Sequence, residues 1–283
     1  MSKKIAVIND LSGFGRCSLI AAISTISAMG VQPCPLPTAI LTAQTEYPSY
    51  YCDDYTDKME HFRREWKKMG QCFDGIYTGF VASEAQIRNI FEFIDTFDRP
   101  ETFLLVDPVM GDDGVKYDTF TPNLLEEMKR LAKRADIITP NLTEICLLTG
   151  ADYEEIKSIF DYKILKGRIK ELAQAFMEDG PEHVIVTGIR FVNEDNVSMM
   201  GNMYFTGNEC RVCAFPYIGG SYSGTGDLFA SCLAAGIARG DKIPEIIELA
   251  GEFLELALLD SVKEGIPEND GVNYEKFLSK LMK

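Results

Sequence analysis

The chain has 283 residues, of which 46% are hydrophobic and 25% charged, as in a soluble globular protein with a substantial core. Its formal net charge of −15 argues against binding to nucleic acid or to a membrane surface, because both are themselves negatively charged. No apolar run approaches the roughly 20 residues of a membrane span, and the N-terminus lacks the apolar stretch of a signal peptide, so we expect a cytoplasmic protein.

Cysteine and histidine do not point to a metal or redox centre. The eight cysteines are scattered, and only Cys210 and Cys213 form a CxxC pair. Neither a second pair nor histidines follow it, and it lies in a strand-like run, so reduced thiols are favoured over a zinc or redox site. With only two histidines, His61 and His183, we expect acid–base chemistry to rest on carboxylates.

The N-terminal segment has the pattern that opens parallel-sheet proteins. A short apolar strand is expected at residues 4–8, then a loop over residues 9–15, then a helix over residues 18–29 closed by Gly30. The loop has Ser18 where a dinucleotide-binding loop has its third glycine, and the chain contains no P-loop motif. Neither nucleotide-binding fingerprint is therefore predicted.

The middle of the chain alternates between expected strands and helices. Three prolines in residues 31–38 suit an edge strand or an extended entry rather than a central strand. Further strands are expected at 74–78, 102–106, 135–139 and 183–186, and helices at 57–69, 85–97, 122–133 and 243–262. Two long helical segments are expected within residues 153–178.

The segment from Asn193 to Pro216 reads as a small β flap, with one or two strands in residues 196–215 and a turn at Thr206-Gly207-Asn208. No linker or repeat interrupts the chain. The pattern therefore predicts an α/β fold with a mostly parallel sheet, in a single domain covering residues 1–283.

The most informative stretch is GGSYSGTGDLFASCLAAGIARG, residues 219–240. A glycine-rich loop that leads into a helix N-terminus presents unpaired backbone N–H groups and the positive end of the helix dipole. Such a place suits a phosphate. A carboxylate placed there, Asp227, repels phosphate oxygens unless it has a chemical role. The role that fits is to accept the proton of a hydroxyl that attacks phosphorus, although a plain helix-capping Asp remains an alternative.

Polar residues also collect just after each predicted strand. Parallel strands end at one edge of a sheet, where ligands bind, so we expect these groups to converge on one crevice. Several are acidic and would repel a phosphate unless Mg²⁺ lay between them. The groups are Asp10, Ser12, Thr45, Asp107, Asp112, Thr139, Asn141, Glu144, Thr187 and Asp227.

Three motifs, taken in order, resemble the ribokinase-like small-molecule kinases. They are Asp107-Pro108-Val109-Met110, then Thr139-Pro140-Asn141 with Glu144, and Gly224-Thr225-Gly226-Asp227. More narrowly, the chain is similar to the pyridoxal/pyridoxamine and hydroxymethylpyrimidine kinases over nearly its whole length. The resemblance implies a three-layer α/β/α fold, a homodimer, and pyridoxal kinase activity, the ATP-dependent phosphorylation of a hydroxymethyl group.

The resemblance also assigns roles by position. It makes Asp227 the catalytic base and the N–H groups of Gly224, Thr225 and Gly226 an anion hole. It implies that Glu144 acts through Mg²⁺ and that Asp112, Thr139 and Thr187 hold a monovalent cation, expected to be K⁺. The residues implied to lie near ATP are Asp107, Asn141, Thr187, Gly188 and Ser223.

The substrate pocket implied by the resemblance consists of Asp10, Ser12, Gln44, Thr45, Tyr47 and Phe80. The segment Thr45-Glu46-Tyr47 and the turn at Phe80 are similar to pyridoxal kinases. The loop from Asp10 to Gly15 and the pair Ala43-Gln44 resemble hydroxymethylpyrimidine kinases instead, although those kinases commonly carry Cys where this chain has Asp227. A carboxylate at position 10 would pair with a protonated ring nitrogen or amine. Ser12, Tyr47 and Phe80 also fit purely structural roles.

Four functions stay open at this point. A vitamin B6 kinase is the leading hypothesis, and a hydroxymethylpyrimidine kinase of thiamine synthesis is the alternative. A sugar kinase is more remote, because Phe14, Tyr47 and Phe80 favour a flat aromatic ring. A non-catalytic nucleotide-binding regulator is disfavoured by the presence of Asp227 and of acids suited to Mg²⁺.

Overall fold

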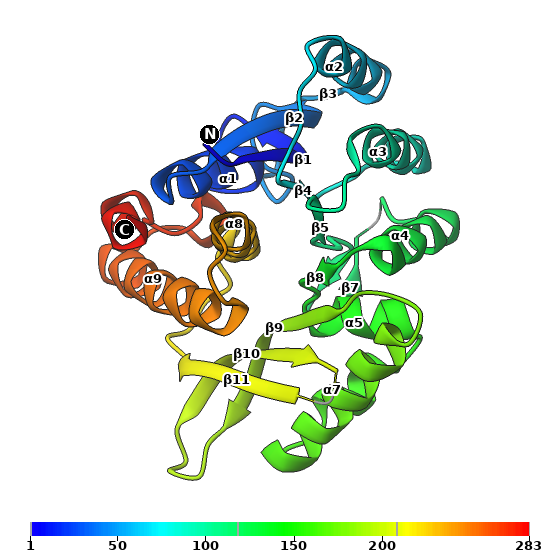
Figure 1. Cartoon of the computed structure of the whole chain (residues 1–283). Helices are drawn as coiled ribbons and strands as arrows, with labels where there is room; N and C mark the ends of the chain where they lie inside the picture. The colour runs from blue at the N-terminus through cyan, green and yellow to red at the C-terminus, as the bar shows by residue number, and fades with distance from the viewer. Residues whose placement is uncertain (1, 118, 208, 283) are drawn as a thin grey trace. The chain divides into compact units, whose positions relative to one another are not determined.

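The computed structural model of the protein describes residues 2–117, 119–207 and 209–282, and Figure 1 shows its helices and strands. The chain forms two compact parts. We call residues 1–103 with 218–283 the terminal part, because it holds both ends of the chain, and residues 104–217 the middle part. Each part is described by itself.

The sheet of the terminal part is built around β1 (Lys4–Ser12). Strands β2 (Gln32–Leu41) and β4 (Gly75–Thr78) pair with β1 in parallel on either side, and β3 (Cys52–Asp54) pairs antiparallel with the end of β2. Residues 5–8 of β1 are fully buried, as expected for a central parallel strand covered on both faces.

The sequence predicts that strand β1 ends at Ile8, but the strand continues through Asn9 to Ser12. The extra length comes from a register shift between Asn9 and Leu11, after which Leu11 and Ser12 pair with the last residues of β2. A bulge of this kind lets a strand carry a turn-like sequence and re-aims its side chains. Asp10 and Ser12 are therefore buried strand residues and not loop residues.

Strand β2 accommodates three prolines because of its hydrogen-bonding direction. The N–H of Gln32 donates to Lys3 O next to β1, so Pro33, Pro35 and Pro37, at alternate positions, direct their nitrogens away from β1. Strand β3 pairs only with residues 39–41. The missing N–H groups thus lie where no described strand pairs, which confirms the expected edge character.

Helices cover both faces of this sheet (Figure 1). Helices α1 (Ser18–Ala28) and α8 (Thr225–Arg239) pack against β1, and α9 (Ile243–Glu264) packs on α8. Helix α2 (Thr56–Lys68) contacts β2 and α3 (Glu84–Phe97). The approach of α8 to α9 is so close that a Cβ at Gly236 would lie 2.6 Å from Ile246. The helices predicted in these segments are confirmed.

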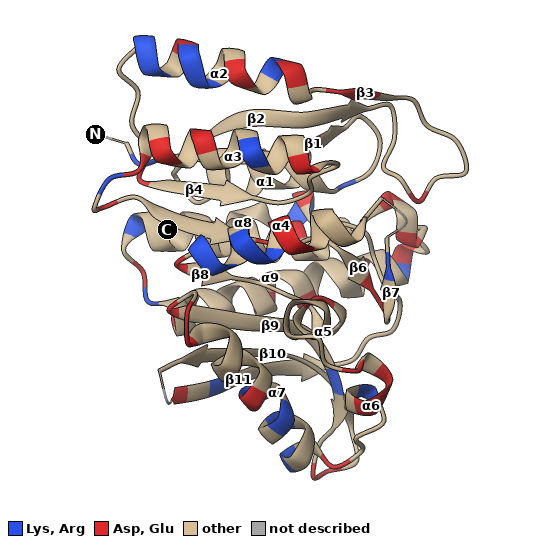
Figure 2. Ribbon diagram, turned by 90° about the vertical axis from the view of Figure 1, so that its right-hand side faces the viewer, with Lys and Arg blue, Asp and Glu red and all other residues tan. Residues whose placement is uncertain are grey.

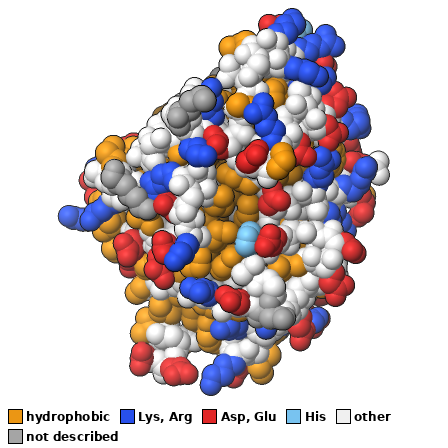
Figure 3. All heavy atoms as spheres, in the orientation of Figure 1, with side chains coloured by type: hydrophobic (Ala, Val, Ile, Leu, Met, Phe, Trp, Pro, Cys, Tyr) orange, Lys and Arg blue, Asp and Glu red, His pale blue; other side chains and the backbone are white. Residues whose placement is uncertain are grey.

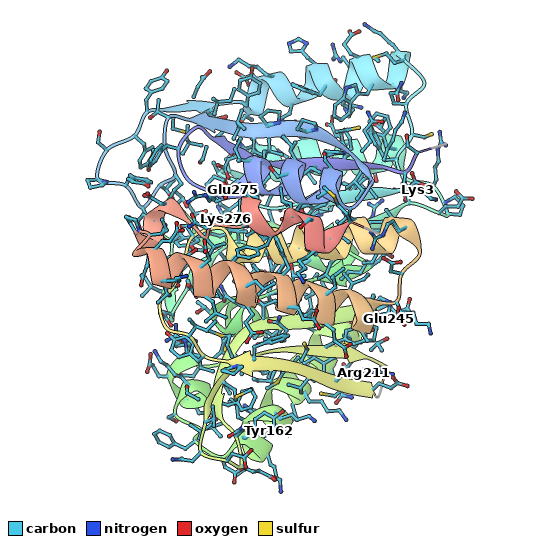
Figure 4. The ribbon with its side chains drawn as sticks, turned by 90° about the vertical axis from the view of Figure 1, so that its left-hand side faces the viewer. Lys3, Tyr162, Arg211, Glu245, Glu275 and Lys276 are labelled. Carbon is cyan, nitrogen blue, oxygen red and sulfur yellow. The ribbon has the colours of Figure 1, made fainter. Side chains whose placement is uncertain are left out.

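The C-terminal segment folds back onto the start of the chain. It contains two short 3-10 helices, η1 (Glu268–Asp270) and η2 (Glu275–Leu281). Glu275 and Lys276, labelled in Figure 4, lie on η2. Arg16 Nε donates to Glu275 Oε1 over 2.7 Å, and Lys276 Nζ donates to two carboxylates of α9, at 2.7 and 2.6 Å.

Charged side chains on exposed helices pair locally. On α2, Arg63 and Arg64 both donate to Glu60, and the ribbon of this helix in Figure 2 carries both acidic and basic positions. Figure 3 shows acidic and basic side chains interspersed on one face. Such pairs each contribute under about 1 kcal/mol, so they add little to the stability of the fold.

The sheet of the middle part begins with parallel strands and ends with antiparallel ones. Strands β5 (Phe103–Val106, whose first residue belongs to the terminal part), β8 (Ile137–Ile138) and β9 (His183–Val192) are parallel. Strands β10 (Ser198–Thr206) and β11 (Glu209–Pro216) continue antiparallel. A separate hairpin joins β6 (Gly111–Asp112) to β7 (Val115–Lys116).

Strand β9 and the hairpin that follows it differ from the sequence predictions. Strand β9 was expected to end at Val186, but it runs on through Thr187 and Gly188 to Val192, because β10 pairs with it there. The predicted flap is the hairpin of β10 and β11, and it extends the sheet rather than standing apart from it. Asn208 of its predicted turn lies outside the described residues.

The helices of the middle part are α4 (Pro122–Arg134), α5 (Leu142–Thr149), α6 (Tyr153–Lys157) and α7 (Tyr162–Met177). The prediction of two long helical segments in residues 153–178 is half wrong, since α6 is a single short helix. Helix α5 was not predicted at all.

The predicted fold class, α/β with mostly parallel strands flanked by helices, is confirmed. The single domain stays a prediction. None of the helices in the described part of the chain is long and apolar enough to span a membrane.

Candidate active site

Asp227 is the third residue of α8, at the end of the glycine-rich loop. The residue that caps this helix, Gly224, has φ +82°, and a Cβ there would lie 2.1 Å from Arg16 O. Both the left-handed backbone and the close approach therefore require glycine. Gly224 has no side chain that could accept hydrogen bonds from the N–H groups of the first turn. These N–H groups are therefore available to an anion.

The carboxylate of Asp227 is held at both oxygens by other elements. Asn9 Nδ2 on β1 donates to Oδ1 over 3.0 Å, and the backbone N of Ser18 donates to Oδ2 over 2.8 Å. Ser18 has φ +50°, a left-handed conformation that is strained for a residue other than glycine. The start of α1 is thus held in an unfavourable backbone conformation in contact with this carboxylate.

Desolvation, together with the negative charge of Asp10, raises the pKa of Asp227 from 3.8 to about 6, against the hydrogen bonds from Ser18 and Asn9. A carboxylate with this pKa is mostly ionised at neutral pH, yet is a better proton acceptor than an ordinary aspartate.

Asn9 was not predicted as a site residue. Its side chain is fully buried, and its Oδ1 accepts hydrogen bonds from the backbone N of Asp10 at 3.0 Å and of Phe80 at 2.9 Å. In the sequence, Asn9-Asp10 looks like turn chemistry, and only the distant partners Phe80 and Asp227 show that it is not.

Asp10 and Ser12 lie together beside this carboxylate. Ser12 Oγ donates to Asp10 Oδ2 over 2.8 Å, and both residues are buried. Desolvation raises the pKa of Asp10 despite its hydrogen bonds to Ser18 and Ser12. A buried acid of this kind favours a cationic or proton-donating partner.

The segment predicted to bind substrate after β2 is attached to η1. Gln44 Nε2 donates to Asn269 O over 3.1 Å, and Gln44 Oε1 accepts from Glu46 N over 2.9 Å. The Tyr47 hydroxyl donates to Asp270 Oδ1. The side chain of Gln44 thus has backbone partners at both ends, while the neighbouring Thr45 is exposed.

Two aromatic side chains stand next to each other at this segment. The rings of Phe14 and Tyr47 meet edge to face, with centroids 5.5 Å apart, and Phe14 is 55% exposed. Desolvation, and then the bond to Asp270, raises the pKa of Tyr47 to about 12. The partly buried Phe80 follows the end of β4.

The glycine-rich loop before Asp227 is attached to the same C-terminal segment. Ser223 N donates to Glu268 O over 3.1 Å, and Arg16 N donates to Asp270 O over 3.1 Å. The structure therefore brings together, within the terminal part, the predicted residues Asp10, Ser12, Gln44, Tyr47, Ser223 and Asp227.

A second group of predicted residues meets in the middle part. Glu144 is the third residue of α5, and its Oε2 accepts from the N of Asn141, the residue that caps this helix, over 2.8 Å. Asn141 Oδ1 in turn accepts from Glu144 N over 2.9 Å, which completes a capping box. Glu144 Oε1 accepts from Met110 N over 3.1 Å.

Asp107 lies next to this box after β5. Its Oδ1 accepts from Thr139 Oγ1 over 2.9 Å, and both residues are buried. Desolvation, and then the charge of Asp107, raises the pKa of Glu144 well above 4.5. Two buried carboxyl groups this close disfavour double ionisation unless a cation lies near them.

Mg²⁺ would fit this pair. Proteins usually hold Mg²⁺ by one or two carboxylates together with phosphate oxygens and water, rather than by a complete protein cage. Asp107 and Glu144 supply oxygen donors of this kind. Within the described ranges, no cluster of three or more His, Cys, Asp or Glu is placed to bind a metal.

The remaining predicted residues are less tightly placed. Asp112 is exposed in the β6–β7 hairpin, where it accepts from Asp113 N over 2.9 Å. Thr187 N donates to Pro140 O over 2.9 Å, and Gly188 has φ +69°. The cation-binding role of Asp112, Thr139 and Thr187 and the convergence of both groups on one crevice stay predictions.

The CxxC pair lies on β11, as expected of a strand-like run. Cys210 and Cys213 are three residues apart, so their side chains point to opposite faces of the sheet. Both are free thiols.

Comparison with known proteins now identifies the family. Residues 17–271 match the phosphomethylpyrimidine kinase family. The chain belongs to that family. Its resemblance to the vitamin B6 kinases is also confirmed, since a crystal structure of pyridoxal kinase from Lactobacillus plantarum is 26% identical, with a TM-score of 0.85, and covers 99% of this chain and 96% of that one.

A second relative is more similar. The crystal structure of a protein assigned as a phosphomethylpyrimidine kinase from Bacteroides thetaiotaomicron is 35% identical, with a TM-score of 0.90 and 99% and 94% of the two chains covered. Another crystal form of it was determined with pyridoxal.

Among curated proteins, one assigned as a pyridoxal kinase from Schizosaccharomyces pombe is 32% identical over 176 residues, which are 59% of this chain. The match spans 47% of that relative's length.

Proposed function

We propose that this chain is an ATP-dependent kinase that phosphorylates the 5′-hydroxymethyl group of a B6 vitamer: pyridoxal, pyridoxamine or pyridoxine. The observation that carries the proposal is the environment of Asp227. Its carboxylate stands in the first turn of a helix whose N–H groups are open to a phosphate, has a pKa of about 6, and neighbours the buried acid Asp10. The family match and the relative determined with pyridoxal support the substrate class.

In the proposed reaction the hydroxymethyl oxygen attacks the γ-phosphorus of ATP. The new oxygen–phosphorus bond forms as the bond from phosphorus to the ADP oxygen breaks, and Asp227 takes the hydroxyl proton. The N–H groups of Gly224, Thr225 and Gly226 stabilise the charge on the phosphoryl oxygens. Asn9 and Ser18 fix the carboxylate in one orientation, which reduces the reorganisation needed during transfer.

We infer that the nucleotide is bound mainly by residues of the middle part. Asp107 and Glu144 would hold Mg²⁺, which would neutralise phosphate charge. We assign Asp107, Asn141, Thr187, Gly188 and Ser223 to ATP, and Asp112, Thr139 and Thr187 to a monovalent cation, by the resemblance of their motifs to the family. These assignments, the homodimer and the single domain remain parts of the proposal.

Asp10 is proposed to select the substrate ring. Its buried carboxyl group would pair with a protonated ring nitrogen or amine, and Ser12 holds the second oxygen of that group. In the proposed pocket Phe14, Tyr47 and Phe80 surround a flat ring. Asp10→Asn is expected to change the relative kcat/KM for pyridoxal and pyridoxamine, and an unchanged ratio would refute this role.

Hydroxymethylpyrimidine kinase activity is the second candidate. It is favoured by the family that the chain matches, and by the name of its Bacteroides relative. The two candidates share Asp227, the anion hole and ATP, and differ only in the aromatic ring that carries the hydroxymethyl group.

The deciding experiment is an ATP-consumption assay with purified protein, Mg²⁺ and K⁺. Pyridoxal, pyridoxamine, pyridoxine and hydroxymethylpyrimidine are compared side by side. We expect the B6 vitamers to be turned over well above the pyrimidine. A preference for the pyrimidine would replace the first candidate with the second, and no turnover of any of them would refute both.

A further inference from the structure

Asn9 lies where two functional elements of the terminal part meet. Its side chain is fully buried, and it contacts both the turn at Phe80 and the carboxylate of Asp227. No other buried amide described in this part has partners on both the proposed substrate pocket and the proposed base.

The orientation of this amide is determined by its contacts. Two backbone N–H groups, those of Asp10 and Phe80, donate to the same side-chain atom of Asn9. Only the amide oxygen accepts such bonds. The NH₂ group must then face Asp227 Oδ1, 3.0 Å away, and a flipped amide would lose all three bonds.

Packing holds the amide in place as well. A Cβ at Gly79 would lie 2.5 Å from Asn9 Nδ2 and 2.7 Å from its side-chain carbon. The absence of a side chain at Gly79 thus makes room for the amide, and any larger residue at that position would displace it. The three hydrogen bonds therefore hold the amide in a space that only glycine at position 79 leaves open.

We propose that Asn9 is a positioning residue that couples the turn at Phe80 to the catalytic carboxylate. Its amide oxygen is fixed by the substrate-side turn, and its NH₂ group aims Asp227 Oδ1 and stabilises the ionised form. A substrate ring that moves Phe80 therefore also moves the base. This inference rests on the proposed role of Asp227 and adds to it the residue that orients it.

Asn9→Ala tests the coupling. The variant loses the donor to Asp227, so we expect kcat to fall at least about tenfold with little change in KM for the substrate. The acidic limb of the pH profile of kcat/KM should move to higher pH by about one unit, because a bond to the ionised form has been removed. Asn9→Ser, which keeps a small polar group, is measured in parallel in case the alanine variant does not fold.

The other titratable groups that act on this carboxylate are unchanged in these variants. Asp10 on β1 is one of them, and Cys17, directly before α1, is the other. Burial and the two carboxylates raise the pKa of Cys17 to about 12, so its thiol stays neutral across the acidic limb. Asp10 stays in place next to the altered residue and is present in every variant compared.

The chain offers a matched control in Asn273. This asparagine is also buried and donates its Nδ2 to carboxylates, Asp260 at 3.2 Å and Glu264 at 2.9 Å, on α9. Asn273→Ala should lower the melting temperature without moving the acidic limb. If Asn9→Ala left the limb in place, or lowered kcat no more than Asn273→Ala does, the coupling would be refuted.

A double variant separates positioning from general damage. In the Asp227→Asn background, Asn9→Ala should lower the residual kcat by less than threefold, because the ionised, proton-accepting group that Asn9 orients is already absent. An additional loss as large as in the wild-type background would overturn the proposal. Full turnover by Asp227→Asn alone would instead refute the proposed base, which distinguishes that failure from a failure of the Asn9 inference.

Discussion

Asp227 and Glu144 occupy the same helical position and are used in opposite ways. Each is the third residue of its helix, α8 and α5 respectively. Glu144 reaches back to the N–H of its own cap residue, Asn141, and closes a capping box. Asp227 has a shorter side chain and follows a glycine cap that offers no side-chain partner, so its carboxylate is held by Asn9 and Ser18 from other elements.

The difference separates a carboxylate held by its own helix from one held by distant parts of the chain. The oxygens of Glu144 accept from two backbone N–H groups, and the group is deeply buried beside Asp107, where a cation satisfies it best. Asp227 is only partly buried and has a pKa of about 6, so it gains and loses a proton near neutral pH. The following tests address this contrast.

The largest effect is expected for Asp227→Asn. An amide of the same shape has no proton affinity, so kcat should fall about a thousandfold, within the range that general base catalysis contributes. The measurement is steady-state turnover, with circular dichroism to show that the fold is kept. A loss smaller than tenfold would mean that Asp227 is a helix-terminal residue and not the base.

A smaller effect is expected for Glu144→Gln. The amide keeps an oxygen for one backbone donor but loses the charge, so the Mg²⁺ concentration for half-maximal turnover should rise about tenfold. The Mg²⁺ dependence of Asp227→Asn, measured on its residual activity, is the control and should stay as in wild type. An unchanged Mg²⁺ dependence in Glu144→Gln would remove this residue from the metal site.

The pH dependence of stability should differ between wild type and Asp227→Asn. Because the folded-state pKa of Asp227 is about 6 and the ordinary value is 3.8, the folded state binds more protons between these values. The unfolding free energy of wild type should therefore fall, relative to the variant, as pH rises from about 4 to about 6, by on the order of 1–2 kcal/mol after allowance for its partial exposure.

Urea denaturation at pH 4.5, 5.5 and 7.0 measures this difference. A relative stability that rose with pH would show that the ionised carboxylate is favoured in the folded protein, opposite to the expectation.

The smallest effect is expected for Tyr47→Phe. Loss of the hydroxyl bond to Asp270 should lower the unfolding free energy by about 1 kcal/mol and raise KM for the vitamer several-fold. Tyr204→Phe is a matched control, because Tyr204 bonds His183 Nδ1 at 3.0 Å in the middle part. The control should lose similar stability with no change in KM. Equal KM effects in both would remove Tyr47 from the pocket.

Much of this architecture was accessible from the sequence, because apolar strands and amphipathic helices have regular periods. The motif at Asp227 was placed correctly at a helix start. Helix α5 was missed although Asn141 and Glu144 form an N-cap and third-residue pair followed by an apolar run, a recognisable helix start.

Other features depend on partners that are distant in the chain. Asn9-Asp10 has the composition of a turn, and the bulge that keeps it in β1 exists only because β2 continues beside it. Asn9 is 218 residues away from Asp227, so no local pattern reveals their bond. The role of a buried amide is decided by what surrounds it.

The three prolines of β2 have a consequence for the protein's behaviour at high concentration. Over residues 33–37 the outer side of this strand is a sheet edge, where another chain could add a strand through backbone hydrogen bonds. Pro33, Pro35 and Pro37 remove the donors on that side, so an incoming strand would leave half of its own acceptors without partners. The three prolines thus disfavour intermolecular β-pairing and amyloid-like growth at this edge.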